Sequence, residues 1–220
     1  MLMGQDLAHK RPWLLASLIF GLSYPLTLTS PVPGVFAIIW KMAAVGLLIP
    51  YALRRHHHGD FLWLAVVLAF CALGDGLVEI SLQAGAVAFA AAHLAAIWLY
   101  SRHRRAQISA SQKLLAAVVL VSVPLIAWAL PADRDLAWQA GVYAVLLSAM
   151  AAMAWTSAFP RYRVGTGAIL FVMSDLLIFA REGSLGGQQW ADYAIWYLYY
   201  IGMLLITIGV VQTLLIRGRR

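Results

Sequence analysis

The chain contains eight long runs of apolar residues, separated by short segments that carry charge, proline or glycine. Each run has about 17–25 residues, the length that an α-helix needs to cross the hydrocarbon core of a bilayer. The composition agrees, because 63% hydrophobic and 11% charged residues lie well outside the range of soluble domains. We therefore predict an all-α, polytopic integral membrane protein, a single transmembrane domain over residues 1–220, with helices at approximately 13–29, 32–53, 61–82, 84–100, 113–130, 137–158, 164–180 and 190–215.

The first run follows Lys10 and Arg11, an arrangement that also begins secretory signal peptides. It continues into Tyr24 and Pro25, however, and it lacks a clear Ala-x-Ala cleavage site. We therefore expect a retained helix. The compact loops and the Ala- and Arg-rich composition are compatible with a bacterial inner (cell) membrane, with a eukaryotic internal membrane as the alternative.

Basic residues are strongly biased toward one side of the predicted topology. Of the 16 Lys and Arg residues, all but Lys41, Arg134 and Arg181 fall at the two termini or in the loops that follow the second, fourth and sixth helices. The positive-inside rule then predicts that both termini are cytoplasmic. The same rule accounts for the net charge of +7, so the charge indicates no nucleic-acid partner.

The third run is unusual because Leu64 to Leu82 carries Asp75 and Glu79 inside an otherwise apolar stretch. An acidic side chain near the bilayer centre costs about 2.5–3.5 kcal/mol on insertion scales, so each is a functional-site hypothesis by default. Residues four apart lie on one helical face, and we therefore expect the two carboxylates to face the same surroundings.

Three other ionisable residues, Lys41, His93 and Asp175, lie at a similar depth when counted from the non-cytoplasmic ends of their helices. Three carboxylates and one lysine cannot all be charged and matched, so at least one carboxyl is expected to hold its proton. A protonated carboxyl beside an ionised one is the arrangement of hydrolases that act on acetal-like bonds. Proton-coupled transport would use the same residue types.

Each of these residues also has a structural interpretation that needs no activity. Lys41 can be a counter-ion for one carboxylate, and His93 can be a neutral hydrogen-bonding residue between helices. The aromatic residues from Trp196 to Tyr200, which include Tyr197 and Tyr199, can belong to an interfacial aromatic belt. Trp190 and Trp196 suit such a belt better than Tyr199 and Tyr200. Small residues four apart indicate close helix packing: Ala140, Ala144, Ser148, Ala152 and Thr156, and Ala88, Ala92 and Ala96.

No motif for hydrolysis by other chemistry is present: the chain has no nucleophile elbow, no His-Glu-x-x-His and no Cys/His metal spacing. Cys71 lies within an apolar run and is interpreted as a small buried hydrophobe. The tract His56 to His58 is interpreted as a solvated loop.

The pattern resembles the YhhN-like lysoplasmalogenase family, eight-helix membrane proteins that hydrolyse alkenyl lysophospholipids. The resemblance rests on Lys41, Gly74-Asp75 in ALGDGL, Phe89 with His93, Tyr143, GAILFVMSD from Gly167 to Asp175, and Tyr199-Tyr200. The chain departs from the pattern near Ala96 and near Met203, where a Tyr and a Gln are expected.

This resemblance implies cleavage of the vinyl ether bond of lysoplasmalogens, with Asp75 and Asp175 as the acid–base pair in either order. It implies a lysophospholipid substrate drawn from the bilayer, no metal or organic cofactor, and no obligate protein partner. Lys41 would keep a carboxylate ionised or meet the substrate phosphate. The residues expected to bind substrate or support the pair are Lys41, Glu79, His93, Tyr143, Ser174, Tyr199 and Tyr200.

Overall fold

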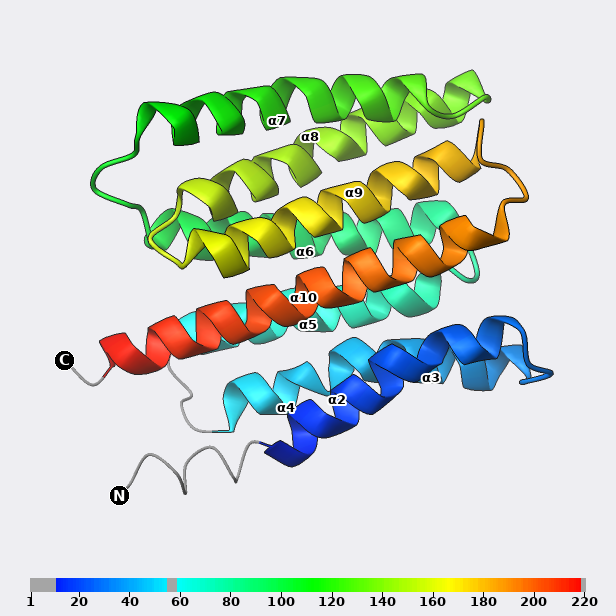
Figure 1. Cartoon of the computed structure of the whole chain (residues 1–220), viewed down its shortest axis with the longest axis horizontal. Coiled ribbons are helices and arrows are strands. Elements are labelled where there is room, and N and C mark those ends of the chain that lie inside the picture. Colours follow the sequence, from blue (N-terminus) through cyan, green and yellow to red (C-terminus); the bar gives the residue numbers. More distant parts are fainter. Residues whose placement is uncertain (1–10, 55–58, 219–220) are drawn as a thin grey trace. The chain divides into compact units, whose positions relative to one another are not determined.

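The computed structural model describes residues 11–54 and 59–218, and within these residues every regular element is helical (Figure 1). The predicted all-α fold is confirmed. In chain order the elements are α2 Arg11–Ser23, η1 Tyr24–Leu28, α3 Gly34–Gly46, α4 Leu48–Leu53, α5 Gly59–Leu77, α6 Leu82–Arg102, α7 Ala110–Ala129, α8 Arg134–Thr156, η2 Arg161–Gly165, α9 Thr166–Arg181 and α10 Gln189–Arg217.

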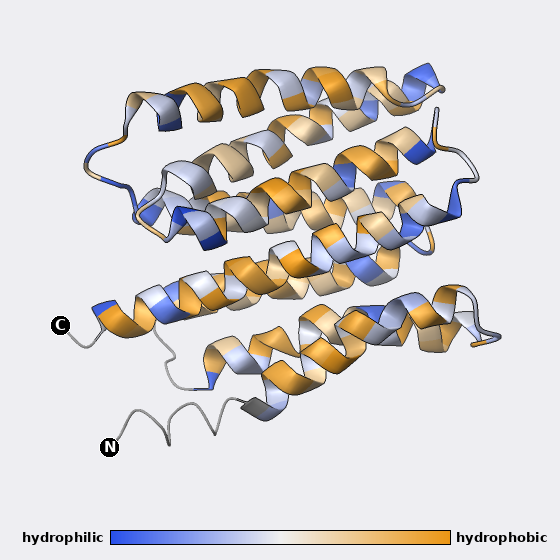
Figure 2. Ribbon diagram, in the orientation of Figure 1, coloured by the Kyte–Doolittle hydropathy of each residue, from blue (hydrophilic) through white to orange (hydrophobic). Residues whose placement is uncertain are grey.

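Grouped by continuity, these elements form the eight predicted helices. Within the described ranges, seven are long and apolar enough to cross a membrane: α3 with α4, α5, α6, α7, α8, η2 with α9, and α10. The first, Pro12–Leu28, is also apolar but shorter. Figure 2 shows apolar residues along the helices and polar residues mainly at their ends and in the loops. The protein is therefore a polytopic membrane protein, while the cytoplasmic location of its termini stays a prediction.

Packing divides the chain into two compact units, with the division between Ala95 and Ala96 inside α6. The first unit contains α2, η1, α3, α4, α5 and the beginning of α6. The second contains the rest of α6 and the elements from α7 to α10. Each unit is described by itself.

In the first unit, proline sets the shape of the early helices. Pro50 cannot donate to the carbonyl of Gly46, and the helix breaks at Leu47 between α3 and α4.

The α2–α3 pair is held by side-chain hydrogen bonds: Ser17 Oγ donates to the carbonyl of Ala44 at 2.5 Å, and Trp40 Nε1 donates to Ser23 Oγ at 3.1 Å. These polar side chains are thus paired between the two helices, as an apolar environment requires.

In the second unit, small residues allow close helix packing. The predicted stripe on α8 is buried at Ala140, Ala144, Ser148 and Ala152, and α8 packs on α7 and α9. Between α9 and α10 the backbones touch, because a Cβ added to Gly167 would lie 2.6 Å from the carbonyl oxygen of Gly202. The packing interpretation of the α8 stripe is confirmed.

One helix end differs from the prediction in a way that matters for the site. We expected the third helix to run to Leu82, but α5 ends at Leu77 and residues 78–80 form a turn. The amide of Ser81 donates to the carbonyl of Leu77 at 2.8 Å, and Ser81 Oγ accepts from the amide of Ala84 at 3.4 Å, so this serine caps the next helix. Glu79 therefore belongs to the turn.

Candidate functional site

Asp75 lies near the end of α5 and is 1% exposed. Glycines flank it on both sides, and each makes room for a neighbouring helix of the first unit. A Cβ added to Gly74 would lie 2.9 Å from the ring of Phe89 on α6, and one added to Gly76 would lie 2.6 Å from Sδ of Met42 on α3. The glycines on either side of Asp75 thus let α6 and α3 pack closely on α5 at the level of this buried residue.

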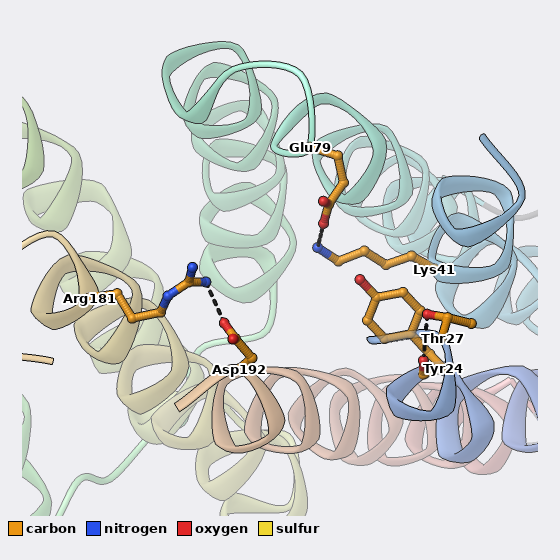
Figure 3. Close-up of polar contacts among 6 residues, drawn as sticks. All are labelled: Tyr24, Thr27, Lys41, Glu79, Arg181 and Asp192. Atoms are coloured by element: carbon orange, nitrogen blue, oxygen red, sulfur yellow. Dashed lines mark hydrogen bonds and ion pairs between the residues drawn. The ribbon is translucent and has the colours of Figure 1, made fainter. Parts of the chain in front are cut away.

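Lys41 and Glu79 form an ion pair with Nζ 2.6 Å from Oε1 (Figure 3). The Lys41 side chain is 14% exposed and that of Glu79 is 38% exposed. The ring of Tyr24, from η1, has its centroid 5.7 Å from the Lys41 ammonium. The expectation that Glu79 shares a helical face with Asp75 is wrong, because the turn places Glu79 beyond the end of α5.

His93 lies on α6 within the first unit and is 2% exposed. Phe89, one helical turn before it, packs on Gly74. Both residues of the Phe89 and His93 motif are therefore in the interior, on the helix whose Phe89 packs on Gly74.

Asp175 lies on α9 in the second unit and is 5% exposed. Its Oδ2 accepts a hydrogen bond of 2.6 Å from the hydroxyl of Tyr143 on α8. The Tyr143 ring meets the ring of Phe179 edge-on, with centroids 5.9 Å apart. Two helices thus hold one buried carboxyl in a defined orientation.

Ser174 is buried beside Asp175 in the sequence, but its side chain points to a different partner. Its hydroxyl donates to the carbonyl of Ile195 on α10 at 2.9 Å. This bond ties α9 to α10, and it gives Ser174 a structural role within the described residues.

The aromatic residues of α10 are packed in the interior of the second unit. Tyr199 and Tyr200 are 5% and 0% exposed, and Trp196 stacks on Tyr200 with an interplanar angle of 9°. The suggestion that Trp196 suits an interfacial belt is wrong, since it is 3% exposed. Trp190, which is 54% exposed, agrees with that suggestion.

Two contacts had no counterpart in the sequence analysis. The Tyr24 ring beside Lys41 depends on the short helix η1, which no apolar periodicity indicates. Arg181 at the end of α9 pairs with Asp192 at the start of α10, with Nη1 2.6 Å from Oδ1 (Figure 3). The opposite charges of Arg181 and Asp192, at the ends of consecutive helices, are the sequence signal that could have predicted this ion pair.

The predicted residues thus fall into two groups. Lys41, Glu79, Asp75 and His93 belong to the first unit, and Tyr143, Ser174, Asp175, Tyr199 and Tyr200 belong to the second. The pairing of Asp75 with Asp175 stays a prediction. In residues 11–54 and 59–218, no three His, Cys, Asp or Glu side chains are grouped as metal ligands. The tract His56 to His58 lies outside those residues.

Comparison with known proteins identifies the family. The model of the YhhN family matches residues 36–210, which include every predicted site residue. Searches of curated proteins and of solved structures gave no match. The match covers most of the chain and both carboxyl-bearing helices, and the protein therefore belongs to the YhhN family.

Proposed function

We propose that this protein is a membrane-embedded hydrolase that cleaves the vinyl ether bond of lysoplasmalogens. The observation that carries the proposal is the burial of Asp75 and Asp175, at 1% and 5% exposure, inside two membrane-spanning helices. Such carboxyls are costly in hydrocarbon and are kept where they perform a function. Membership of the YhhN family supports the same activity.

The proposed reaction needs one acid and one carboxylate. A carboxylic acid protonates the outer carbon of the vinyl ether, and the double-bond electrons form the new C–H bond. The resulting oxocarbenium ion is captured by water, which loses a proton to a carboxylate. The hemiacetal then collapses: its hydroxyl loses a proton to the carboxylate as the C=O bond forms, its C–O bond to glycerol breaks, and the glycerol oxygen takes a proton from the carboxylic acid. A fatty aldehyde and a glycerophospho-base are released. One water is consumed.

Asp75 and Asp175 are assigned as this pair, in either order. General acid–base groups of this kind typically contribute about 10²–10⁴-fold to a rate. Tyr143 supports the pair by holding the Asp175 carboxyl through its 2.6 Å hydrogen bond. His93, Tyr199 and Tyr200 are proposed to shape the surroundings of the reacting atoms, and all three are buried. The mechanism uses no metal or organic cofactor.

A site inside the bilayer suits the proposed substrate, because the alkenyl chain of a lysoplasmalogen already lies in lipid. The single chain and the polar headgroup would then enter together from the membrane. We propose the bacterial inner membrane as the location, on the composition and loop lengths described above.

The test is aldehyde release by purified protein in detergent. Lysoplasmalogen, a saturated alkyl-ether lysolipid and an acyl lysolipid are supplied side by side, and only the first should yield aldehyde. Asp75→Asn and Asp175→Asn should each lower the rate at least 100-fold. Asp192→Asn is the matched control, since Asp192 is partly exposed and pairs with Arg181.

Two results would overturn the proposal. Full rates in both Asn variants would remove the acid–base assignment. Movement of lysolipid between vesicles without aldehyde release would instead identify a lipid carrier or proton-coupled transporter. Lower thermal stability in the variants, with neither activity present in the parent protein, would leave a purely structural role for the carboxyls.

A further inference from the structure

One end of the second unit carries basic residues and no acidic ones. Figure 1 shows that α6, α8 and α10 finish at this end, whereas α7 and α9 begin there. The chain segments at this end are 102–109, 157–166 and 214–218, and their sequences contain no Asp or Glu. Their basic residues are Arg102, Arg104, Arg105, Arg161, Arg163 and Arg217. The positive-inside rule explains such a bias by the number of basic residues, and it requires no fixed contacts.

Two of these arginines, Arg105 and Arg217, are nevertheless held in place by the connection between α8 and η2. Nε and Nη2 of Arg105 donate to the carbonyls of Ser157 and Phe159, at 3.1 and 3.2 Å. Nη2 of Arg217 donates to the carbonyl of Ala158 at 3.4 Å. Three consecutive carbonyls thus accept hydrogen bonds from two guanidinium groups, one from the α6–α7 loop and one from the end of α10.

His103 and Phe159 fix Arg217 further. Nη1 of Arg217 donates to Nδ1 of His103 at 2.7 Å, and its guanidinium lies 5.9 Å from the centroid of the Phe159 ring. The rings of His103 and Phe159 have their centroids 4.8 Å apart, and Phe159 is buried. Because a guanidinium has no acceptor atom, Nδ1 of His103 accepts this bond and carries no proton. These partners of the two arginines are therefore neutral and do not offset their charges.

Each of the two guanidinium groups has further donors to offer a ligand. A guanidinium carries five N–H groups in a planar fork, and these bonds use two of them on Arg105 and two on Arg217. Phosphate oxygens fit this fork in pairs, which favours arginine for phosphate recognition. Arg217 is exposed and Arg105 is partly exposed. Two like charges on one tripeptide repel each other, and a bound anion offsets that repulsion.

The position of this arginine pair favours a lipid over a soluble anion. The spans α6 and α10 end at Arg102 and Arg217, so this end of the second unit lies at the level of the lipid headgroups. Ile216, which directly precedes Arg217, is 60% exposed and adds an apolar surface beside the charge. A phosphate that is linked to acyl chains complements both the charge and the apolar surface.

We propose that Arg105 and Arg217 form a binding site for the phosphate of an anionic diacyl phospholipid of the surrounding bilayer. The phosphate accepts hydrogen bonds from both guanidinium groups, and an acyl chain contacts Ile216. A zwitterionic phospholipid would place its ammonium among arginines, which gives selectivity for the anionic lipid. The bound lipid connects the α6–α7 loop with α10 and thereby stabilises this end of the unit. The inference goes beyond the proposed hydrolase activity and does not depend on it.

The test compares two lipids that differ only in the headgroup. Phosphatidylglycerol or phosphatidylcholine with identical acyl chains is added to delipidated protein in a neutral detergent, and native mass spectrometry measures the affinity of each lipid. Phosphatidylglycerol should bind about tenfold more tightly or better, the size expected for one charge-assisted hydrogen bond. Glycerophosphoglycerol, which is the same headgroup without chains, should bind at least about tenfold more weakly than the lipid, because it buries no apolar surface.

Variants then locate the site. Arg105→Gln and Arg217→Gln should each lower the affinity for phosphatidylglycerol about tenfold and leave that for phosphatidylcholine unchanged. Arg104→Gln removes the same charge from the adjacent, exposed residue and should change the affinity less than threefold. Arg134→Gln is a second control with the same charge change, because Arg134 lies at the opposite end of α8, over the ring of Trp128. It should keep the preference of the parent protein.

Three results would overturn the inference. The parent protein could bind both lipids equally, a comparison that needs no variant. Folded Arg105→Gln and Arg217→Gln proteins could keep the parent preference, or Arg104→Gln could match their loss, which would show diffuse attraction to a basic surface. Glycerophosphoglycerol could bind as tightly as the lipid, which would identify a site for soluble phosphates. All of these measurements are independent of aldehyde release, so the lipid site and the hydrolase activity can fail separately.

Discussion

The Tyr143 hydroxyl donates a hydrogen bond of 2.6 Å to Oδ2 of Asp175 and thereby connects α8 to α9 at a buried acidic side chain. This distance is at the short end of the range for hydroxyl–oxygen bonds. The ring of the same tyrosine packs edge-on against Phe179, one turn after Asp175. Tyr143 therefore holds the carboxyl by its hydroxyl while its ring is held by α9.

Tyr143→Phe should separate these two contacts. The ring packing is kept and the hydrogen bond is lost, so the rate of aldehyde release should fall about tenfold, corresponding to about 1.4 kcal/mol. The loss should appear in kcat more than in KM, because Tyr143 is proposed to position Asp175 rather than to bind substrate. The measurement is a steady-state assay over a range of lysoplasmalogen concentrations.

Tyr162→Phe is the control for this change. Tyr162 is 74% exposed and contacts Arg161, so the loss of its hydroxyl should leave kcat unchanged. If Tyr143→Phe matches this control in rate, the hydrogen bond to Asp175 has no part in catalysis.

Ser174 is expected to affect stability but not catalysis, in contrast to the adjacent Asp175. Ser174→Ala removes the bond to the Ile195 carbonyl and should lower stability by about 1 kcal/mol, which is about 2–4 °C in Tm for a chain of this size. The rate of aldehyde release should stay within twofold. A large loss of rate with an unchanged Tm would show instead that the hydroxyl acts on the substrate.

The glycine before Asp75 should be intolerant of any side chain. A Cβ at Gly74 would meet the Phe89 ring at 2.9 Å, so Gly74→Ala forces α5 and α6 apart and should cost about 1–3 kcal/mol. Gly46→Ala is the control, because the nearest atom to its added Cβ is 4.0 Å away. Thermal unfolding of both variants in detergent measures the difference. Equal Tm values would show that the Phe89 contact does not restrict Gly74.

The helices and their approximate ends were predictable because hydrocarbon thickness sets the length of each apolar run. The third helix shows where this fails: Leu77 to Leu82 is apolar enough to continue, yet α5 ends at Leu77 and Ser81 caps α6. Hydropathy does not distinguish a helix from a tight turn of similar composition. Because α5 ends at Leu77, Glu79 lies in the turn, where it pairs with Lys41 instead of sharing a helical face with Asp75.

The sequence predicted which residue types belong to the candidate site, but it did not predict most of the contacts that these residues make. Intramembrane charge alone singled out Lys41, Asp75 and Asp175, since burial of such groups needs a reason. The Tyr143 partner of Asp175 came only from the family resemblance. Trp196 was misjudged because an interfacial tryptophan and a buried one look alike in sequence, and only the stacking on Tyr200 separates them.

Charge bias predicts that the α6–α7 loop is cytoplasmic and that the α9–α10 loop is on the other side. Cysteine labelling in cells tests this, starting from Cys71→Ala, which removes the one, buried, native thiol. Gln107→Cys and Ser184→Cys place a thiol at exposed positions of the two loops. A membrane-impermeant maleimide should label Ser184→Cys in intact cells and Gln107→Cys only after permeabilisation. The reverse pattern would invert the topology and put the Lys41–Glu79 pair at the cytoplasmic end.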